Sequence, residues 1–308
     1  PKTHNPIIRN INNSFIKSSL KKIVQADKYD VILINNYKHY DLIKNYLASD
    51  DYVVYDCMDD FLEFKGSKRS EAVQKEIFNQ EKSLYSRSNL VVFSSEYLKN
   101  QLNKRYYSKD NSLVINNAVE LNFDEKNISL PESLSSLFKQ GMKNICYIGT
   151  VSDWFDFNLI LKSLDMFKNI NFILIGPSDT DIPVHERLLQ HPQIPHSKVF
   201  GAMRKADLLV MPFKVDELVR SVNPVKAYEY IYSCTPSILV RYEETEKFKD
   251  YLYLYNNEQE FFEYINKLIE GKLPSLISEE EADAFANKNT WEKRTDILKG
   301  YLNKQINS

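Results

Sequence analysis

Short apolar runs alternate with longer helix-patterned segments along the whole chain. Several runs are rich in Val and Ile without alternating polar positions, which is typical of strands covered on both faces of a parallel sheet. The alternation therefore predicts an α/β fold with parallel strands and crossover helices. The predicted strands are Asp30–Ile34, Tyr52–Tyr55, Leu90–Ser94, Ser112–Ile115, Asn144–Gly149, Asn171–Gly176, Leu208–Pro212, Ser237–Val240 and Tyr251–Leu254.

A polar segment that contains a proline and several serines, Glu120–Lys143, separates the first four predicted strands from the other five. We place a domain boundary there, and 308 residues are also more than one hydrophobic core usually supports. The prediction is an N-terminal domain over residues 1–138 and a second domain over 139–275.

Both ends of the chain are predicted to be helical. The opening segment through Ala26 is patterned as a helix and not as a first strand, so we expect the N-terminal domain to be incomplete, with strands missing from this sequence. Residues 276–308 contain two helical patterns, Ser278–Asn287 and Thr290–Asn303, the second with Thr290 as its N-cap. We expect them to pack back toward the N-terminal domain.

Composition excludes several classes of function. Lys and Arg total 40 against 42 Asp and Glu, so the net charge of −2 provides no field suited to nucleic acid. Three widely separated cysteines, each in an apolar run, fit reduced thiols in a cytoplasmic protein and not a zinc site. Neither a signal peptide nor an apolar run of about 18 residues is present, which predicts a cytoplasmic protein, soluble or peripheral at the inner face of the membrane.

The segment after the predicted strand Leu208–Pro212 carries candidate ligand chemistry. Asn223 as N-cap and Pro224 at the first position predict a helix start, whose free N–H groups attract anions. Lys226 in the first turn would add a charge for a diphosphate, and Glu229, about 4.5 Å further along the axis, would accept hydrogen bonds from ribose hydroxyls. The alternative is an ordinary surface i,i+3 pair of small energetic value.

This helix resembles the donor-binding helix of GT-B glycosyltransferases, most closely those of the bacterial teichuronic-acid and capsule type. Other segments match the same family in the same order, so the resemblance spans Asp30 to Leu302. They are Tyr55–Asp60, Val92–Glu96, Asn116–Val119, Tyr147–Thr150 with Trp154–Asp156, Ile175–Pro177 and Asn289–Arg294.

The resemblance implies two Rossmann-like domains that face a cleft, with the sugar donor, a nucleotide diphosphate sugar and most simply a UDP-sugar, in the second domain. Gly149 ends a predicted strand, where a glycine lets the backbone approach a phosphate, although a simple turn glycine is the alternative. The other donor-binding residues expected are Thr150, Trp154, His196 in a loop near the base, Arg220, Asn223, Lys226 and Glu229.

The sequence departs from the family in two places. Ser221 stands where retaining members often carry a Glu, and Ser152, Asp153 and Trp154 replace the Arg and Lys that commonly follow the first glycine loop. Phosphate neutralisation would then rest on Lys226, the helix end and Arg220, and an inverting mechanism is favoured.

Three carboxylates follow the second predicted strand, at the end where an α/β sheet presents side chains to its crevice. The segment Tyr55–Asp60 resembles a Tyr-x-x-x-Asp motif of an inverting GT-B glucuronosyltransferase of the xanthan pathway, in which the Asp is the base. That resemblance assigns Asp59 as the catalytic base, with Asp60 as the alternate and Asp56 in an orienting role. Simple capping of the following turn by Asp59 and Asp60 is the competing interpretation.

Two other signals are given less weight. Asp179-Thr180-Asp181 matches a metal-binding DxD motif but lies in a polar loop, so we predict no metal and no cofactor. The segment Tyr97–Lys109 mixes basic and aromatic residues and could touch an anionic membrane, although a solvated helix face is the simpler interpretation.

We therefore predict a glycosyltransferase that moves a sugar from a nucleotide diphosphate donor onto a cell-surface polysaccharide or lipid-linked glycan. The competing hypotheses are a retaining transferase of the same fold and a non-catalytic partner subunit that binds nucleotide sugars.

Overall fold

The computed structural model describes residues 6–26, 29–64, 69–121 and 129–306. The chain forms two compact units, Pro1–Ile115 with Gly300–Ser308, and Asn116–Lys299. The predicted boundary at residue 138 lies later than this division. The reason is that leucines of the polar segment, Leu121, Leu130 and Leu134, pack into the core of the second unit.

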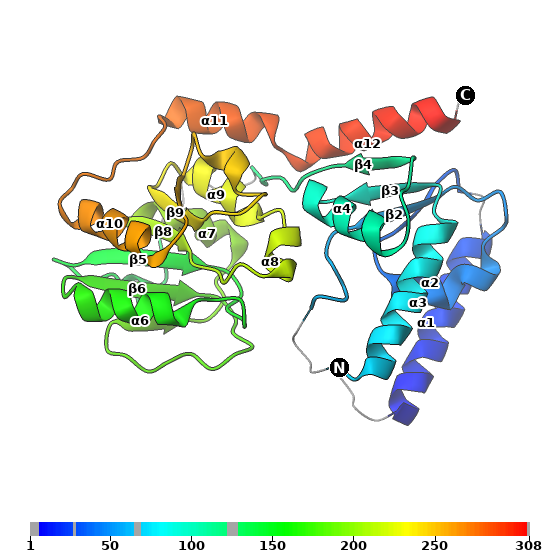
Figure 1. Ribbon diagram of the computed structural model, residues 1–308, viewed down its shortest axis with the longest axis horizontal. Coiled ribbons are helices and arrows are strands. Elements are labelled where there is room, and N and C mark those ends of the chain that lie inside the picture. Colours follow the sequence, from blue (N-terminus) through cyan, green and yellow to red (C-terminus); the bar gives the residue numbers. More distant parts are fainter. Residues whose placement is uncertain (1–5, 27–28, 65–68, 122–128, 307–308) are drawn as a thin grey trace. The chain divides into compact units, whose positions relative to one another are not determined.

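The first unit contains a four-stranded parallel sheet in the order β1-β2-β3-β4, with β2 and β3 buried in the middle. Its strands are β1 Ile32–Ile34, β2 Val53–Cys57, β3 Leu90–Phe93 and β4 Ser112–Val114. Its helices are α1 Pro6–Ala26, α2 Tyr37–Ile43, the 3-10 helix η1 Lys44–Tyr46, α3 Glu71–Arg87 and α4 Glu96–Arg105 (Figure 1).

The second unit contains a six-stranded parallel sheet in the order β10-β9-β8-β5-β6-β7. Its strands are β5 Lys143–Ile148, β6 Ile170–Ile175, β7 Leu188–His191, β8 Leu208–Met211, β9 Ser237–Val240 and β10 Tyr253–Tyr255. The chain moves outward from β5 to β7 and then returns to β8 on the other side of β5. This order is that of a Rossmann fold, and its switch point lies between β5 and β8.

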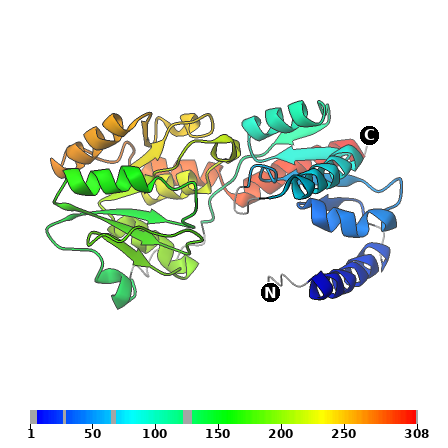
Figure 2. The same cartoon turned by 60° about the horizontal axis from the view of Figure 1, so that its bottom comes forward.

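Helices cover both faces of the second sheet (Figure 2). Helix α6 packs against β6, and its end contacts α10 through Phe167 and Phe262, while α7 and α9 pack together and α11 packs on α9. The helices are α5 Glu132–Ser135, α6 Phe157–Met166, α7 His196–Lys205, α8 Glu217–Ser221, α9 Val225–Ser233, η2 Glu246–Phe248, α10 Glu258–Ile269, α11 Glu279–Lys288 and α12 Trp291–Ile306.

All nine predicted strands are present, with ends shifted by at most two residues. Strand β7 and helix α7 were not predicted; β7, at the sheet edge, has the mixed sequence Leu-Leu-Gln-His. Thr290 is confirmed as the N-cap of α12, because its Oγ1 accepts a hydrogen bond from the Lys293 backbone at 3.3 Å. The last residues of α12, from Gly300, belong to the first unit.

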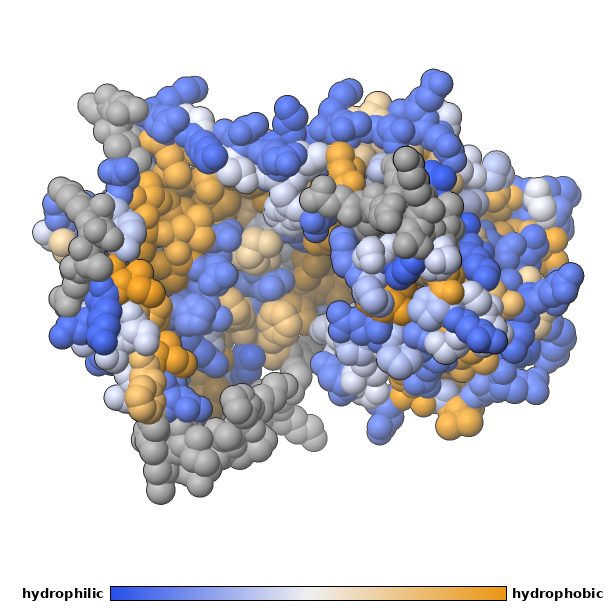
Figure 3. Space-filling model, turned by 180° about the vertical axis from the view of Figure 1, so that it is seen from behind, coloured by the Kyte–Doolittle hydropathy of each residue, from blue (hydrophilic) through white to orange (hydrophobic). Residues whose placement is uncertain are grey.

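The surface combines polar and apolar side chains, and apolar ones gather on the unit at the left of Figure 3. Exposed large apolar side chains of the first unit include Phe15 and Ile23 of α1 and Leu33 of β1. Within the described ranges, no helix combines the length and apolar character that crossing a membrane requires.

Two glycines end the neighbouring strands β5 and β6 and bring their backbones close together. The Gly149 N–H donates to the Ile175 carbonyl at 2.9 Å, and the Gly176 N–H donates to the His191 carbonyl at 3.0 Å. Gly176 has a φ of +141°, and a Cβ on it would lie 2.3 Å from the Gly149 carbonyl oxygen. Only glycine fits this position without displacing backbone.

Replacing Gly176 with Ala should therefore lower the stability of the second unit by about 2–4 kcal/mol, because backbone on both strand ends must move. Urea unfolding followed by fluorescence measures this change. Gly300→Ala is the matched control, since nothing lies within 4 Å of a Cβ in that helical position, and it should be neutral or slightly stabilising. Equal stability of the two variants would contradict the close approach.

Candidate functional site

A cavity of about 460 Å³ lies in the second unit at the carboxyl ends of β5 and β6. Ligands of open α/β sheets bind at this end of the strands, close to the switch point. Its lining residues are Ile148, Gly149, Thr150, Ile175, Gly176, Pro177, Gln193, Ile194, His196, Val199, Lys226 and Glu229.

Helix α9 contributes the two charged groups of this cavity, Lys226 and Glu229. Lys226 Nζ lies 3.0 Å from Glu229 Oε2, and the side chains are 26% and 11% exposed. The two side chains do form the i,i+3 ion pair that was the alternative prediction. The pair is not an ordinary surface pair, however, because it lines a cavity. A part-buried carboxylate beside a cation offers a hydrogen-bond acceptor for hydroxyls and a positive charge for an anion at one place.

Gly149 forms a part of the cavity wall that lies close to Lys226. A Cβ on Gly149 would lie 2.9 Å from Lys226 Cε and 3.0 Å from the Tyr147 hydroxyl oxygen. The Tyr147 hydroxyl donates to the Thr150 carbonyl at 2.8 Å, which fixes the turn that follows the strand. A larger residue at this position would therefore push against the lysine that lines the cavity.

His196 lines the cavity as predicted, but it does not lie in a loop. It is the first residue of α7, after Pro195. Gly176, Pro177 and Gln193 are lining residues that were not proposed as site residues. The sequence does hold a signal for Gly176, because Ile175-Gly176 ends β6 as Ile148-Gly149 ends β5.

Three of the predicted donor-binding residues, Trp154, Arg220 and Asn223, do not line this cavity. Arg220 donates from Nε to Glu243 at 3.1 Å, and this bond lowers the pKa of the Glu243 carboxyl. Trp154 packs against the core, and its carbonyl accepts from the Lys214 N–H at 2.7 Å.

Asn223 is not the N-cap of α9, because the cap position is Pro224. The Asn223 side chain is occupied elsewhere. Its Oδ1 accepts from the Asn117 N–H at 2.8 Å, and its Nδ2 donates to Glu244 at 3.0 Å. Its contacts therefore hold two loops together at the base of the helix.

In the first unit, the loop after β2 carries the predicted catalytic carboxylates. Asp60 is 1% exposed, and its two oxygens accept from the Arg105 guanidinium at 2.8 and 2.7 Å. Such a bidentate pair holds the carboxylate in a fixed direction. The Asp60 carboxylate is therefore engaged in structure.

Asp59 has a different environment from that of Asp60. Burial raises the pKa of the Asp59 carboxyl, and the neighbouring charge of Asp60 raises that pKa further. The loop that carries Asp59 is fixed by the residue that follows β3, since the Ser94 hydroxyl donates to the Met58 carbonyl at 2.6 Å. Within the described ranges, no hydrogen bond to the Asp59 carboxylate is found. These features suit a base better than those of Asp60 do.

A buried glutamate beneath this loop was not predicted from the sequence. Glu81 of α3 is 0% exposed and accepts from the hydroxyls of Tyr55 at 2.8 Å and Tyr106 at 2.7 Å. Burial raises the pKa of Glu81, while the two tyrosine bonds act in the opposite direction. A signal was available, since Glu81 lies on the apolar face of α3 between Ile77 and Leu84.

Comparison with solved structures identifies the architecture. HepE of Anabaena in complex with UDP-glucose superposes with a TM-score of 0.65 and 16% identity, over 96% of this chain and 80% of that one. Sucrose-phosphate synthase of Thermosynechococcus elongatus gives 0.64 and 15%, over 95% and 79%. The fold is that of the GT-B glycosyltransferases. The α/β prediction and the predicted GT-B resemblance are thus confirmed.

Comparison with characterised sequences points to the same class. The chain is 25% identical over 221 residues to TuaH of Bacillus subtilis (strain 168), which is provisionally described as a teichuronic acid biosynthesis glycosyltransferase. The match covers 68% of this chain and 55% of TuaH, so the chain spans about half the length of that relative. No protein-family model matches the chain.

The basic and aromatic segment Tyr97–Lys109, for which a solvated helix face was the favoured interpretation and membrane contact the alternative, is partly turned inward. Arg105 binds Asp60, Tyr106 binds Glu81, and the Lys109 ammonium donates to the Tyr85 carbonyl at 3.0 Å. Lys104 and Tyr107 remain exposed. The segment thus works mainly inside its own unit.

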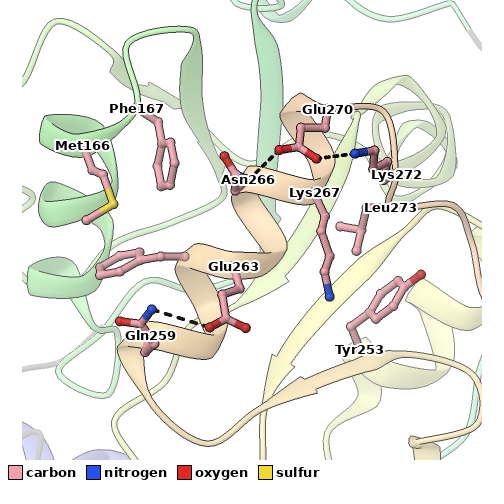
Figure 4. Close-up of a pocket in the computed structure, with 11 residues that line it drawn as sticks. Met166, Phe167, Tyr253, Gln259, Glu263, Asn266, Lys267, Glu270, Lys272 and Leu273 are labelled. Atoms are coloured by element: carbon pink, nitrogen blue, oxygen red, sulfur yellow. Dashed lines mark hydrogen bonds and ion pairs between the residues drawn. The ribbon is translucent and has the colours of Figure 1, made fainter.

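A larger groove of about 790 Å³ lies along α10 (Figure 4). Several of its polar groups bind one another: Glu270 binds Asn266 at 2.8 Å and Lys272 at 2.9 Å, and Gln259 donates to Glu263 at 3.5 Å. Because this groove shares no lining residue with the cavity at the ends of β5 and β6, where open α/β sheets bind their ligands, the smaller cavity is the better candidate.

Replacing Arg105 with Met should destabilise the first unit by about 3–5 kcal/mol, because the Asp60 carboxylate would stay buried without its partner. Urea unfolding monitored by circular dichroism tests this. Lys104→Met, one residue away and exposed, is the control and should change stability by less than about 0.5 kcal/mol. Adding Asp60→Asn to the Arg105→Met variant should recover part of the lost stability. If Arg105→Met is as stable as the parent protein, the ion pair does not support this loop.

Proposed function

We propose that this chain is a glycosyltransferase that takes its sugar from a nucleotide diphosphate donor held in the 460 Å³ cavity. The observation that carries the proposal is that Lys226 and Glu229 line one cavity at the carboxyl ends of β5 and β6, in a chain with the GT-B fold. Glu229 would accept the ribose hydroxyls, and Lys226 would sit beside the diphosphate.

The nucleotide is proposed to be UDP. HepE, which shares the fold, has been solved with UDP and with UDP-glucose. His196 and Gln193 lie at the same cavity and are candidates to contact the base. The acceptor is proposed to be a cell-surface polysaccharide or a lipid-linked glycan, and the relative TuaH is described as acting in teichuronic acid biosynthesis. Work on a lipid-linked acceptor would place the chain at the inner face of the membrane.

Asp59 is proposed as the base that takes the proton from the acceptor hydroxyl as its oxygen attacks the anomeric carbon, with inversion. Its raised pKa supports this, because a base works best with a pKa near the working pH. Ser221, at the position where retaining members often carry a Glu, is fully buried and donates to the Leu218 carbonyl at 2.7 Å.

A retaining transfer is the second candidate. One of the matched structures, a trehalose-6-phosphate synthase with a TM-score of 0.65 and 12% identity, is described as transferring with retention. In that case Asp59 would only orient the acceptor. NMR of the product anomer separates the two mechanisms, and a non-catalytic partner subunit would give no product at all.

Transfer is proposed to need no metal ion. Asp179 and Asp181, the ends of the DxD match, are exposed in a turn after β6, where the Ser178 hydroxyl donates to the Thr180 carbonyl at 2.7 Å. Neutralisation of the diphosphate would come from Lys226 instead. Transfer should therefore proceed in EDTA, and activity that appears only after Mg²⁺ or Mn²⁺ is added would refute the metal-independent mechanism.

Replacing Glu229 with Gln should weaken UDP binding about tenfold or more, because charge-assisted bonds to the ribose hydroxyls are lost. Calorimetry with UDP and with 2′,3′-dideoxy-UDP makes the test specific. The parent protein should lose affinity for the dideoxy analogue, while the variant should bind both ligands alike. Glu258→Gln breaks an exposed Lys–Glu pair of 2.7 Å on α10 and should bind UDP normally. Equal discrimination by parent and Glu229 variant would remove the ribose assignment.

Replacing Asp59 with Asn should reduce transfer about 10²- to 10⁴-fold while UDP affinity stays unchanged. The pH profile gives a second test. A base must be ionised, so kcat/KM should fall as the pH drops through the pKa of Asp59. Asp60→Asn removes a charge that raises this pKa, so the acidic limb should move to lower pH. A fully active Asp59→Asn variant, or a limb that moves upward, is inconsistent with this role.

A further inference from the structure

A second cavity in the same unit, about 520 Å³ in volume, shares no lining residue with the proposed donor cavity. It lies where η2 and the junction of α11 and α12 meet Tyr228 of α9. The GT-B assignment and the proposed transfer chemistry leave this cavity without a role.

The cavity carries more positive than negative charge. Lys247, Lys288 and Arg294 line it, together with one carboxylate, Glu281. Glu281 is committed to the capping box of α11, accepting from the Ser278 N–H at 2.9 Å and its hydroxyl at 3.1 Å. The charge of Lys247 is offset by Glu244 at 2.5 Å. With Glu244 counted, three cations stand against two carboxylates, so one positive charge is in excess, and Lys288 and Arg294 are the cations of the lining that form no ion pair within the described residues.

Arg294 is oriented by neutral groups only, as far as the described residues show. Its Nε and Nη2 each donate to the Asn117 carbonyl at 3.3 Å, and Nη2 also donates to Asn289 Oδ1 at 2.6 Å. Its guanidinium carbon lies 6.0 Å from the centre of the Tyr228 ring. These partners fix the group without cancelling its charge, so the guanidinium is preorganised for an anion.

Aromatic rings form an apolar wall beside these cations. Phe285 contacts Tyr251 with ring centres 4.8 Å apart and Tyr228 with centres 5.9 Å apart, and Phe285 and Tyr251 are only partly buried. A pyranose ring has a face of C–H groups that packs on aromatic faces, while its ring substituents reach polar groups. A rigid cation next to exposed aromatic surface therefore suits an acidic sugar.

We propose that this cavity binds an acidic sugar residue of a glycan, with its carboxylate or phosphate on Arg294 and Lys288 and its ring against Phe285 and Tyr251. If the chain is the transferase proposed above, the acceptor or product is then an anionic glycan; this last step rests on the proposed function. Binding of the acidic sugar does not depend on the proposed function, and it can be measured without a sugar donor and without transfer.

Calorimetry of the whole chain with a linear trimer of galacturonic acid, glucose 1-phosphate and the neutral trimer maltotriose tests the proposal. At low salt we expect the uronide, the sugar phosphate or both to bind, and maltotriose to bind at least tenfold more weakly. The tighter of the two acidic ligands identifies the source of the anion. Binding should weaken as salt is raised, because the attraction is between charges at a partly open site. Inorganic phosphate that binds as tightly as either acidic sugar would overturn the sugar part.

The decisive variant is Lys288→Glu, because this side chain is exposed and makes no ion pair within the described ranges, so the fold does not depend on it. It should weaken binding of the acidic sugar about tenfold. Lys293→Gln, exposed on α12 and absent from the cavity lining, is the control and should bind normally. Arg294→Gln should abolish binding, and Arg294→Lys should restore part of it.

If Lys288→Glu binds the acidic sugar as the Lys293 control does, the proposal is wrong. UDP affinity, measured in parallel, should be unchanged in all of these variants. Glu229→Gln should lose UDP binding and keep acidic-sugar binding. Lys288→Glu should lose acidic-sugar binding and keep UDP binding. These two results together would show that the cavities bind independently. A failure of one proposal is therefore distinguishable from a failure of the other.

Discussion

The second unit depends on the near contact between the backbones at the ends of β5 and β6. A Cβ on Gly176 would lie 2.3 Å from the Gly149 carbonyl oxygen, and one on Gly149 would press on Lys226 and Tyr147. Because both positions are glycine, the strands end side by side with main chain exposed to the cavity. Any bulk there would fill space that is proposed for the diphosphate, so packing and proposed binding depend on the same two residues.

The architecture was predictable because parallel strands buried on both faces have an unmistakable apolar pattern. Runs such as Ile145–Ile148 and Leu208–Met211 are continuous in sequence and fully or nearly fully buried in the structure. Strand β7 was missed because it lies at the sheet edge, where Gln190 is exposed and His191 only partly buried, so the strand has no continuous apolar run. The boundary between the units was misplaced because the polar segment contributes leucines to the second core.

The candidate site was predictable where one helix carried the signal, and not where several segments had to meet. Lys226 and Glu229 are three residues apart on α9, so their closeness follows from helix geometry. Asn223 was mistaken for a cap because Asn is favoured there, yet its contacts with Asn117 and Glu244 are set by tertiary packing. A sequence pattern does not indicate which distant residues will become partners. The ion pair between Asp60 and Arg105, which are 45 residues apart, could not be predicted for the same reason.

Helix α9 has one more consequence, which follows from its position between two cavities. Glu229 lines one of them, and the adjacent Tyr228 lines the other. Because successive residues of an α-helix point about 100° apart, these two neighbouring side chains reach different walls. One helix of nine residues thus supplies a wall to each cavity, and a change that breaks the α9 backbone, such as a proline in its interior, would disturb both of them.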